Sequence, residues 1–302
     1  MAWIDSINSA PAYVGRFAPS PTGPLHFGSI VAALASWLDA RANAGQWLLR
    51  IEDLDPPRES ISAPDIIKGQ LEALGLTWDG TPLHQSTRLD AYETALARLV
   101  EIGAVFPCIC SRKVVRGIYP GTCRDKEFSS DSDTISAIRF RVPSKSIRFM
   151  DRISGLHQFN LISEIGDFVV RRRDGRVAYQ LAVVVDDAHQ GITDIVRGDD
   201  LLDSTPRQNC LIETLGYQTI RYSHLPVVLG HDHKKLSKQA QATPISTENP
   251  VKILQDALNC LGQAKIDNTN SIESLLNEAI ATWNPASIPH VSTVWPRQYS
   301  PD

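Results

Sequence analysis

A turn rich in glycine and proline leads into a helical pattern near the start of the chain, in the stretch RFAPSPTGPLHFGSIV. His26, Gly28 and Ser29 stand where that helix would begin. Free N–H groups and the positive end of the helix dipole bind anions at such a place, phosphate above all. A histidine there can donate to phosphate oxygens whose charge increases in a transition state. A rigid turn with an incidental histidine remains an alternative, because the stretch matches neither GxGxxG nor the P-loop.

Three of the five cysteines, Cys108, Cys110 and Cys123, fall within sixteen positions. This spacing is a poor disulfide framework and a better metal cluster, which favours a reducing cytoplasm. Zinc prefers four ligands at a closed structural site, but no fourth Cys or His lies between Cys108 and Cys123. Buried cysteines without a metal therefore remain an alternative. Cys210 and Cys260 lie in apolar helical patterns that are typical of a core.

Two acidic pairs, Asp186–Asp187 and Asp199–Asp200, could suggest a second metal site. We expect them instead to end a strand or to cap a helix. The run RRRDGR at 171–176 makes a locally basic region that could follow RNA phosphates. We expect most of its individual arginines to lie on a solvated strand face, so none is counted as a site residue.

The elements around these residues alternate between strands and helices. The hydrophobic pattern predicts strands at 12–18, 47–53, 177–187 and 222–230, and helices at 29–44, 63–74, 88–102, 205–215, 251–261 and 272–283. Strand, helix and strand in this order favour a parallel sheet with crossover helices. Residues 104 to about 175 change character and are predicted to be an insertion between two halves of that sheet.

Composition limits the class of protein. The 302 residues are 42% hydrophobic and 21% charged, enough to bury a core in one large or two ordinary domains. The formal net charge of −4 gives no global sign of nucleic-acid binding, so any RNA contact must be local. No apolar run approaches the roughly 20 residues that cross a bilayer. MAWIDSINSA lacks the pattern of a signal peptide, so a cytoplasmic location is expected.

Four stretches in order carry a family resemblance. RFAPSPTGPLHFGS resembles the signature of class I aminoacyl-tRNA synthetases of the glutamyl type, and HFGS occupies the place of their HIGH motif. KLSKQ, at 235–239, occupies the place of their KMSKS loop, while RIEDLDPPR and DIVRGDDLLDSTPRQ match between the two. The resemblance spans 13–239, most of the chain. It implies an α/β fold with a Rossmann-type parallel sheet, an inserted zinc-bearing α+β subdomain and a short helical C-terminal region.

The resemblance implies domain boundaries and site residues. The halves of the catalytic domain would be 1–103 and 176–240, the insertion 104–175 and the C-terminal region 241–302. The implied glutamate pocket comprises Arg16, Phe17, Ala18, Pro19, Ser20, Glu52, Tyr179 and Arg197. The implied ATP site comprises His26, Gly28, Ser29, Lys235, Ser237 and Lys238. Tyr119 would be the fourth zinc ligand, beside Cys108, Cys110 and Cys123.

Glutamate presents two carboxylates and one ammonium group, so its site needs arginines and an acid. Arg16, Glu52 and Arg197 all fall near the carboxyl ends of predicted strands, where ligands of parallel sheets bind. We expect Glu52 to bind the ammonium group and the two arginines to bind the carboxylates. In-line attack of the α-carboxylate on ATP would give glutamyl-adenylate, with Mg²⁺ arriving on the ATP phosphates. The expected catalytic set is His26, Gly28, Ser29 and Lys238, which would stabilise the leaving pyrophosphate.

Chain length selects a branch of the family. Only 64 residues follow Lys238, little room for an anticodon-binding domain, because domains usually need about 50 to 150 residues. The pattern resembles the glutamyl-queuosine branch, which lacks that domain. This branch activates glutamate without tRNA and transfers it to queuosine in tRNA(Asp). The implied partners are ATP, L-glutamate and queuosine-containing tRNA(Asp). The protein is expected to be a monomer and to have no membrane partner.

Three alternatives stay open. The first is a small glutamyl-tRNA synthetase that charges a tRNA 3′ end. The second is a non-catalytic synthetase-like module that binds RNA, although such a module would be expected to lose His26 or Lys238. The third is a nucleotidyl transferase acting on another small acid, which would not keep Arg16, Glu52 and Arg197 together.

Overall fold

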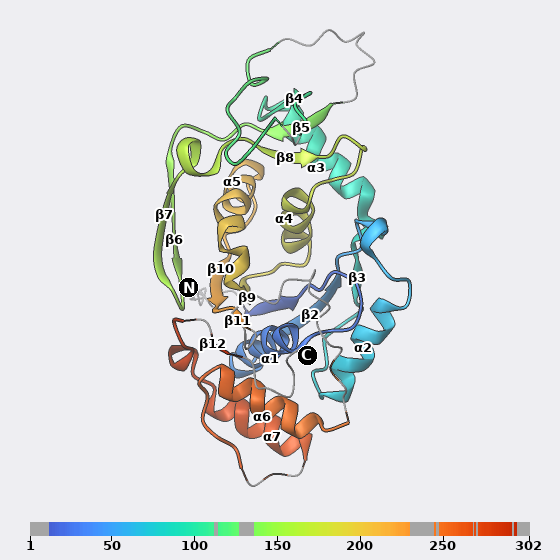
Figure 1. The fold of residues 1–302 in the computed structure, drawn as a ribbon, viewed down its shortest axis with the longest axis vertical. Helices are drawn as coiled ribbons and strands as arrows, with labels where there is room; N and C mark the ends of the chain where they lie inside the picture. The colour runs from blue at the N-terminus through green and yellow to red at the C-terminus, as the bar shows by residue number, and fades with distance from the viewer. Residues whose placement is uncertain are drawn as a thin grey trace, which may run out of the picture.

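The structure of the protein is a computed structural model (Figure 1). It describes residues 12–111, 114–126, 136–229, 245, 248–267, 269, 271–291 and 293–294. A central layer of strands lies between the inserted region at one end and two C-terminal helices at the other (Figure 1). Among the described helices, none combines the length and the apolar character needed to cross a bilayer.

The first half of the sheet is parallel, as the sequence predicts. β1 (Val14–Phe17) pairs with β2 (Gln46–Ile51), and β2 pairs with β3 (Leu83–His84). α1 (Phe27–Ala42) makes the crossover between β1 and β2, and α2 (Ala63–Ala73) leads from β2 to β3. α1 carries buried side chains nearly all round, because it packs between the sheet and the C-terminal helices.

The second half of the sheet adjoins β1. β9 (Asp194–Gly198) and β10 (Arg221–Leu225) are parallel, and α5 (Thr205–Leu215) connects them. Next to β9, the backbone N–H of Thr193 donates to the carbonyl of Val14 at 2.9 Å, which joins the two halves beside β1. The register sets Arg197 of β9 directly opposite His224 of β10.

One predicted strand is wrong. Residues 177–187 do not form a strand, because α4 (Tyr179–His189) occupies this segment. The run LAVVV is apolar at every position, and periodicity cannot separate a buried strand from a buried helix in so short a run. α4 packs against α3 (Leu89–Glu101), α5 and β8 (Phe168–Arg171), so its whole apolar stretch is buried. Asp186 and Asp187 therefore lie inside a helix and not at the end of a strand.

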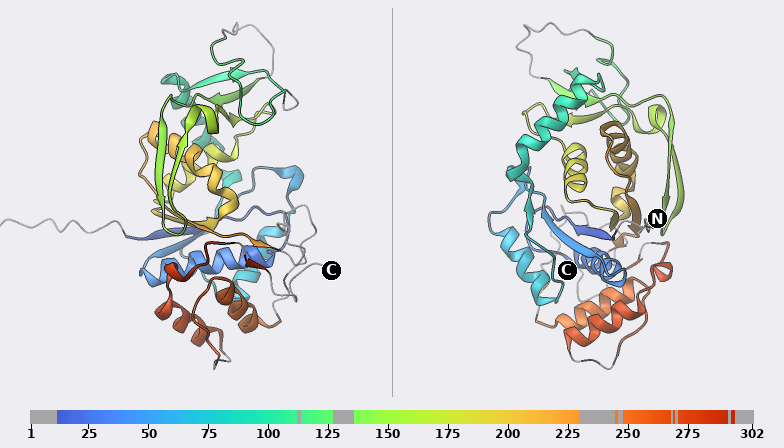
Figure 2. Two further views of the ribbon diagram at one scale, coloured as in Figure 1. Left: turned by 60° about the vertical axis from the view of Figure 1, so that its left-hand side comes forward. Right: turned by 180° about the vertical axis from the view of Figure 1, so that it is seen from behind.

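The inserted region contributes to two sheets. β4 (Val105–Cys108), β5 (Ala137–Phe140) and β8 (Phe168–Arg171) form a small antiparallel sheet. β6 (Ser146–Asp151) and β7 (Gly155–Asn160) form a hairpin that instead joins β10, with Asp151 opposite Tyr222. The two views in Figure 2 show this hairpin reaching from the inserted region to the main sheet. Part of the predicted insertion thus completes the sheet of the second half, in the order β7-β6-β10-β9.

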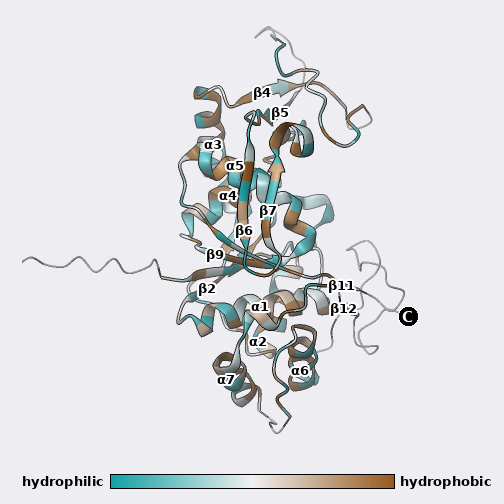
Figure 3. Ribbon diagram, turned by 90° about the vertical axis from the view of Figure 1, so that its left-hand side faces the viewer, coloured by the Kyte–Doolittle hydropathy of each residue, from teal (hydrophilic) through white to brown (hydrophobic). Residues whose placement is uncertain are grey.

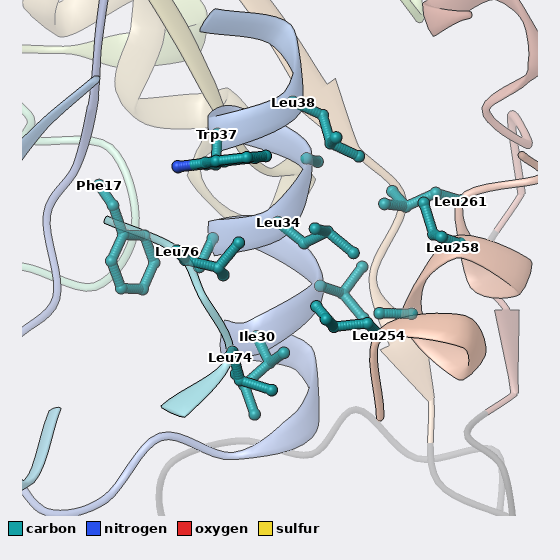
Figure 4. Packing of buried hydrophobic residues seen from close by; sticks show 14 of the residues in the cluster. Phe17, Ile30, Leu34, Trp37, Leu38, Leu74, Leu76, Leu254, Leu258 and Leu261 are labelled. Atoms are coloured by element: carbon teal, nitrogen blue, oxygen red, sulfur yellow. The ribbon is translucent and has the colours of Figure 1, made fainter. Parts of the chain in front are cut away.

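The C-terminal helices α6 (Pro250–Cys260) and α7 (Ile272–Thr282) share a core with the first half of the sheet. Figure 4 shows Leu254 and Leu258 facing the side chains of α1, including Leu34. Each helix carries both hydrophobic and hydrophilic stretches (Figure 3), as expected for helices that cover a core on one side only. The remaining short elements are β11 (Val228–Leu229), which pairs with β12 (Thr293–Val294), and short helical segments at 56–58, 85–88, 161–165, 199–204 and 285–287.

A buried carboxylate on α1 connects distant parts of the chain. Asp39 accepts hydrogen bonds from Tyr13 Oη at 2.5 Å, from Arg152 Nη1 at 2.6 Å and from Trp283 Nε1 at 3.0 Å. Burial raises the pKa of Asp39, but the hydrogen bonds and the charge of Arg152 outweigh it and hold that pKa below its usual range. The start of β1, the β6–β7 hairpin and the C-terminal region are thereby anchored to one helix.

Candidate active site

A pocket of about 340 Å³ opens where β1, β2 and β9 end and α1 begins. The predicted glutamate and phosphate residues that the structure describes all line it: Arg16, Phe17, Ala18, Pro19, Ser20, His26, Gly28, Ser29, Glu52, Tyr179 and Arg197. Lys235, Ser237 and Lys238 lie outside the described residues. Predicted residues that are up to 181 positions apart in the sequence are therefore brought to one hollow, while their individual roles stay predictions.

His26 caps the helix that it precedes. Its backbone is extended, and its Nδ1 accepts from the backbone N–H of Ser29 at 3.2 Å. Because Nδ1 accepts, the proton of the neutral ring resides on Nε2, 3.0 Å from Ser29 Oγ. The first turn of α1 thus brings an imidazole, a serine hydroxyl and the positive end of the helix dipole to the pocket. This combination suits the oxygens of a phosphate group.

Arg16 is held from below by a shared carboxylate. Its Nε donates to Asp187 Oδ1 at 3.2 Å, and Arg50 Nη1 donates to the same oxygen at 2.7 Å. All three side chains are buried. Burial raises the pKa of Asp187, but the charges of Arg50 and Arg16 outweigh it, so this carboxyl stays ionised. Asp187 therefore fixes the Arg16 guanidinium beside the pocket, and its own role is structural.

The neighbouring acid has a comparable structural task. Asp186 accepts from Arg88 Nε at 2.6 Å, from Tyr92 Oη at 2.7 Å and from Gln85 Nε2 at 2.8 Å. The carboxylate is fully buried, and these donors satisfy both of its oxygens. Asp186 therefore connects α4 to α3 and the turn before it, which explains a buried acid inside a helix.

Glu52 follows β2 and keeps about a tenth of its side chain exposed. Its backbone N–H donates to the carbonyl of Pro19 at 3.0 Å, which ties the end of β2 to the turn before α1. Burial, and then the Glu52 charge, raise the pKa of Tyr179, while Arg197 and Arg16 lower it in part. The pocket combines the guanidinium groups of Arg16 and Arg197 with the carboxylates of Glu52 and Asp200. That set complements a small zwitterion carrying an additional acid group.

Arg197 points from β9 and is 5% exposed. Its Nε donates to His224 Nε2 at 3.1 Å, and its Nη2 donates to Thr205 Oγ1 at 2.9 Å and to the Leu201 carbonyl at 3.3 Å. Its Nη1 is buried and has no hydrogen-bond partner in the part of the chain that the structure describes. A buried donor without a partner beside a pocket is a place for a ligand oxygen.

The cysteine cluster lies in the inserted region. The Sγ atoms of Cys108, Cys110 and Cys123 all lie within 4.8 Å of one another, and Tyr119 Oη is 3.5 Å from Cys108 Sγ and 3.9 Å from Cys110 Sγ. Sulfur ligands at about 2.3 Å from a tetrahedral metal would show similar separations. Burial raises the pKa of Cys123, but hydrogen bonds led by Tyr119 outweigh it and lower that pKa to about 7. The cluster can hold a metal ion.

Arg139 supports this cluster. Its guanidinium carbon lies 4.0 Å from the centre of the Tyr119 ring, and its Nε lies 3.3 Å from Cys108 Sγ. A cation in this position offsets the negative charge of thiolates and orients the tyrosine. The three cysteines with the phenol oxygen therefore fit a metal site, with Arg139 as a neighbouring cation.

The sequence patterns did not identify the groups around Arg16 and Arg197. Asp187, shared with Arg50, contacts Arg16, whereas His224, bonded to Asp151, contacts Arg197. Asp187 was misplaced because α4 was taken for a strand. His224 carries a weak signal: in a parallel sheet it stands opposite Arg197, so their side chains share a face. That pairing becomes visible only when the register of β9 and β10 is known.

Comparison with known proteins gives the class first. The model of the catalytic domain of class I tRNA synthetases (E and Q) matches residues 13–119 and 120–256. A crystal structure of the glutamate-tRNA synthetase from Elizabethkingia anophelis superimposes with a TM-score of 0.81 at 23% identity, covering 95% of this chain and 69% of that one. The fold is therefore that of a class I synthetase.

Relatives found by sequence are more similar to this chain than that solved structure is. A glutamyl-Q tRNA(Asp) synthetase from Pseudomonas fluorescens is 50% identical over 299 residues, 97% of this chain and 99% of that protein. A protein of the same name from Pseudomonas putida is 50% identical over 288 residues, 94% of this chain and 97% of its own. The chain belongs to the glutamyl-Q tRNA(Asp) synthetase family of class I synthetases.

Proposed function

We propose that the protein activates L-glutamate with ATP, without tRNA, and transfers the glutamate to queuosine in the anticodon loop of tRNA(Asp). The observation that carries this proposal is the 50% identity with glutamyl-Q tRNA(Asp) synthetases over 97% of the chain. The pocket supports it independently, because it offers two arginines, an acid and a helix N-terminus to one small ligand.

In the first half-reaction, Arg16 and Arg197 bind the carboxylates of glutamate and Glu52 binds its ammonium group. Phe17, Ala18, Pro19, Ser20 and Tyr179 shape the pocket around the substrate. A carboxylate oxygen attacks the α-phosphorus of ATP, and pyrophosphate leaves. His26, Gly28 and Ser29 hold phosphate oxygens, while Lys235, Ser237 and Lys238 also bind phosphates and Lys238 stabilises the leaving pyrophosphate. Mg²⁺ enters with ATP and neutralises phosphate charge.

In the second half-reaction, a hydroxyl of the queuosine ring attacks the carbonyl carbon of glutamyl-adenylate. An ester bond forms, the mixed anhydride breaks and AMP leaves. The enzyme is proposed to act as a cytoplasmic monomer, and size-exclusion chromatography with light scattering at micromolar concentration would contradict this if it gave twice the chain mass.

We propose zinc for the cysteine cluster, held by Cys108, Cys110, Cys123 and Tyr119. Three soft thiolates in a closed and largely buried site favour zinc over oxygen-loving cations. The metal would brace the inserted region, whose small antiparallel sheet has few strands of its own to stabilise it.

The deciding experiment uses labelled glutamate and ATP with two preparations of tRNA(Asp), one carrying queuosine and one lacking it. Label on the queuosine form alone supports the proposal. Equal label on both forms would instead identify a small glutamyl-tRNA synthetase acting at the 3′ end. Absence of glutamate-dependent ATP–pyrophosphate exchange would contradict activation itself and leave a non-catalytic RNA-binding module, or a nucleotidyl transferase for another acid.

A further inference from the structure

A buried histidine separates the pocket from the β6–β7 hairpin. His224 on β10 is 2% exposed, and its Nδ1 lies 2.7 Å from Oδ2 of Asp151 at the end of β6. Its Nε2 lies 3.1 Å from Arg197 Nε. The three side chains therefore form a row that runs from the hairpin through the sheet to the pocket.

The hydrogen bonds determine which ring nitrogen carries the proton. A guanidinium can only donate, so the Arg197 Nε–H requires a lone pair on His224 Nε2. Nδ1 must then carry the proton and donate it to Asp151. Thr205 Oγ1 adds a second contact to Arg197, because it accepts from Arg197 Nη2 at 2.9 Å and lies 3.1 Å from His224 Nε2.

Asp151 is suited to hold that tautomer. Oδ1 accepts from the backbone N–H groups of Ile153 and Ser154, and Oδ2 accepts from both the backbone and the ring of His224. Burial raises the pKa of Asp151, but these bonds outweigh it and lower that pKa to about 2. The carboxylate is therefore ionised at all working pH values.

The two arginines of the pocket are held by partners of different charge. Arg16 donates its Nε to the carboxylate of Asp187, which offsets part of its positive charge. Arg197 donates its Nε to an imidazole that is neutral in this arrangement. Its charge is thus available to the pocket, together with the unpartnered Nη1. An anionic group of the substrate gains more from such a guanidinium than from one that is already neutralised.

We propose that Asp151 and His224 act as a positioning pair that fixes the orientation of the Arg197 guanidinium and so sets the affinity for glutamate. This inference rests on the proposed function, because it assumes that Arg197 binds a glutamate carboxylate. Neither Asp151 nor His224 lines the pocket, so both act through Arg197 and not on the substrate.

The pair makes glutamate binding depend on pH. A protonated His224 has no lone pair for Arg197 and would place two cations side by side. The charged or titratable groups around the ring are Asp151 on β6, His157 on β7, Arg197 on β9 and Tyr222 on β10. Burial is the largest cause that lowers the pKa of His224 below 6.5, and Asp151 opposes it. The KM for glutamate is therefore expected to rise as pH falls below that ordinary value.

The experiment compares His224→Asn with His224→Gln in glutamate-dependent ATP–pyrophosphate exchange. Asparagine reaches the Nδ1 position only and loses the acceptor for Arg197, whereas the glutamine amide oxygen can replace Nε2. We expect His224→Asn to raise the KM for glutamate roughly tenfold or more, with the KM for ATP little changed. His224→Gln should stay close to the unmodified protein. It should also lose the rise in glutamate KM that is expected below about pH 6.5, because it has no imidazole to titrate.

The outcomes separate the two proposals. No exchange and no calorimetric glutamate binding by the unmodified protein would refute the proposed function and the inference with it. An active protein whose His224→Asn variant keeps the glutamate KM, or whose His224→Gln variant loses as much as His224→Asn, overturns the positioning pair alone. If His224→Asn does not fold, the inference is tested by the pH dependence of the glutamate KM in the unmodified protein and in His224→Gln. Identical profiles for the unmodified protein and His224→Gln would overturn the inference.

Discussion

At the scale of single residues, the pocket depends on side chains that never reach it. Arg16 stays in place because Asp187 and Arg50 form a buried cluster beneath it. Such a cluster stabilises less than its Coulomb energy suggests, since all three groups lose water. Removing the Asp187 charge is nevertheless costly, because Arg16 loses the carboxylate that it pairs with and buried Arg50 keeps only the longer ion pair with Glu52, at 3.5 Å.

We predict that Asp187→Asn lowers the free energy of unfolding by about 3–5 kcal/mol, as expected for breaking a buried ion pair from one side. Urea denaturation measures this loss. The matched control is Asp125→Asn, because Asp125 pairs with Arg141 at the surface and its side chain is 87% exposed. The control should change stability by about 1 kcal/mol or less. Equal losses in both variants would contradict the buried-cluster interpretation.

A second residue-scale prediction concerns acid stability. The pKa of Asp151 is about 2 in the folded protein and 3.8 ordinarily, so its contribution is fully present above pH 3.8 and is lost as pH falls toward 2. The shift corresponds to about 2 kcal/mol. The free energy of unfolding, measured by denaturation between pH 5 and pH 2, should therefore fall less steeply in Asp151→Asn than in the unmodified protein. Parallel curves would show that Asp151 has an ordinary pKa.

Prediction from the sequence reached the pocket residues but not their supports. Arg16 and Glu52 could be placed together because each stands near the carboxyl end of a predicted strand. Arg197 was placed with them through the family resemblance, because its own strand β9 was not predicted. Asp187 lies 171 positions from Arg16, and His224 lies 27 positions from Arg197. Their contacts follow from how α4 packs and from the register of β9 against β10. Neither leaves a local pattern in the chain.

At the scale of elements, α4 shows why one prediction failed. Its apolar run fits a buried strand and a buried helix equally well. Only the elements that pack against it in the fold favour the helix. The other predicted helices and the strands β1, β2 and β10 lie within a few residues of their predicted bounds, because glycines and polar caps mark many of their ends, whereas β9 and the β6–β7 hairpin were not predicted. An example is Gly216, which ends α5 in the left-handed conformation at φ 72°.

The cysteine cluster yields a prediction at the same scale. We expect protein purified without chelator to carry a single zinc ion per chain, and Cys108→Ser to lose it, because two thiolates bind zinc far less tightly than three. Metal analysis by mass spectrometry measures both. Cys210→Ser is the matched control, since Cys210 is a buried cysteine of α5 outside the cluster. Zinc-free unmodified protein would contradict the proposed site.

At the scale of the whole molecule, the C-terminal helices are part of the catalytic core and not an appendage. Buried residues of α6 and α7 belong to the same cluster as those of β1, α1 and β2. Trp283 adds a hydrogen bond to Asp39 on α1. A single cooperative unfolding transition is expected for a core that is shared in this way.

We predict that Leu254→Ala lowers the free energy of unfolding by about 2–5 kcal/mol, because it opens a cavity between α6 and α1. Leu156→Ala is the control: Leu156 is 63% exposed on β7, and its loss should cost about 0.5 kcal/mol or less. Circular dichroism and fluorescence should give coincident transitions for both. An early loss of helix alone in Leu254→Ala would show that α6 and α7 unfold separately.

The junction beside β1 also has a consequence during protein synthesis. The hydrogen bond between Val14 and Thr193 joins residues that are 179 positions apart. A nascent chain on the ribosome can form β1, α1 and β2 early, but one edge of β1 stays without its neighbour until β9 has emerged. An open strand edge can pair with other chains, so the nascent chain is most prone to aggregation during this interval. The pocket that Arg197 lines is therefore completed only after the chain has been translated beyond β9.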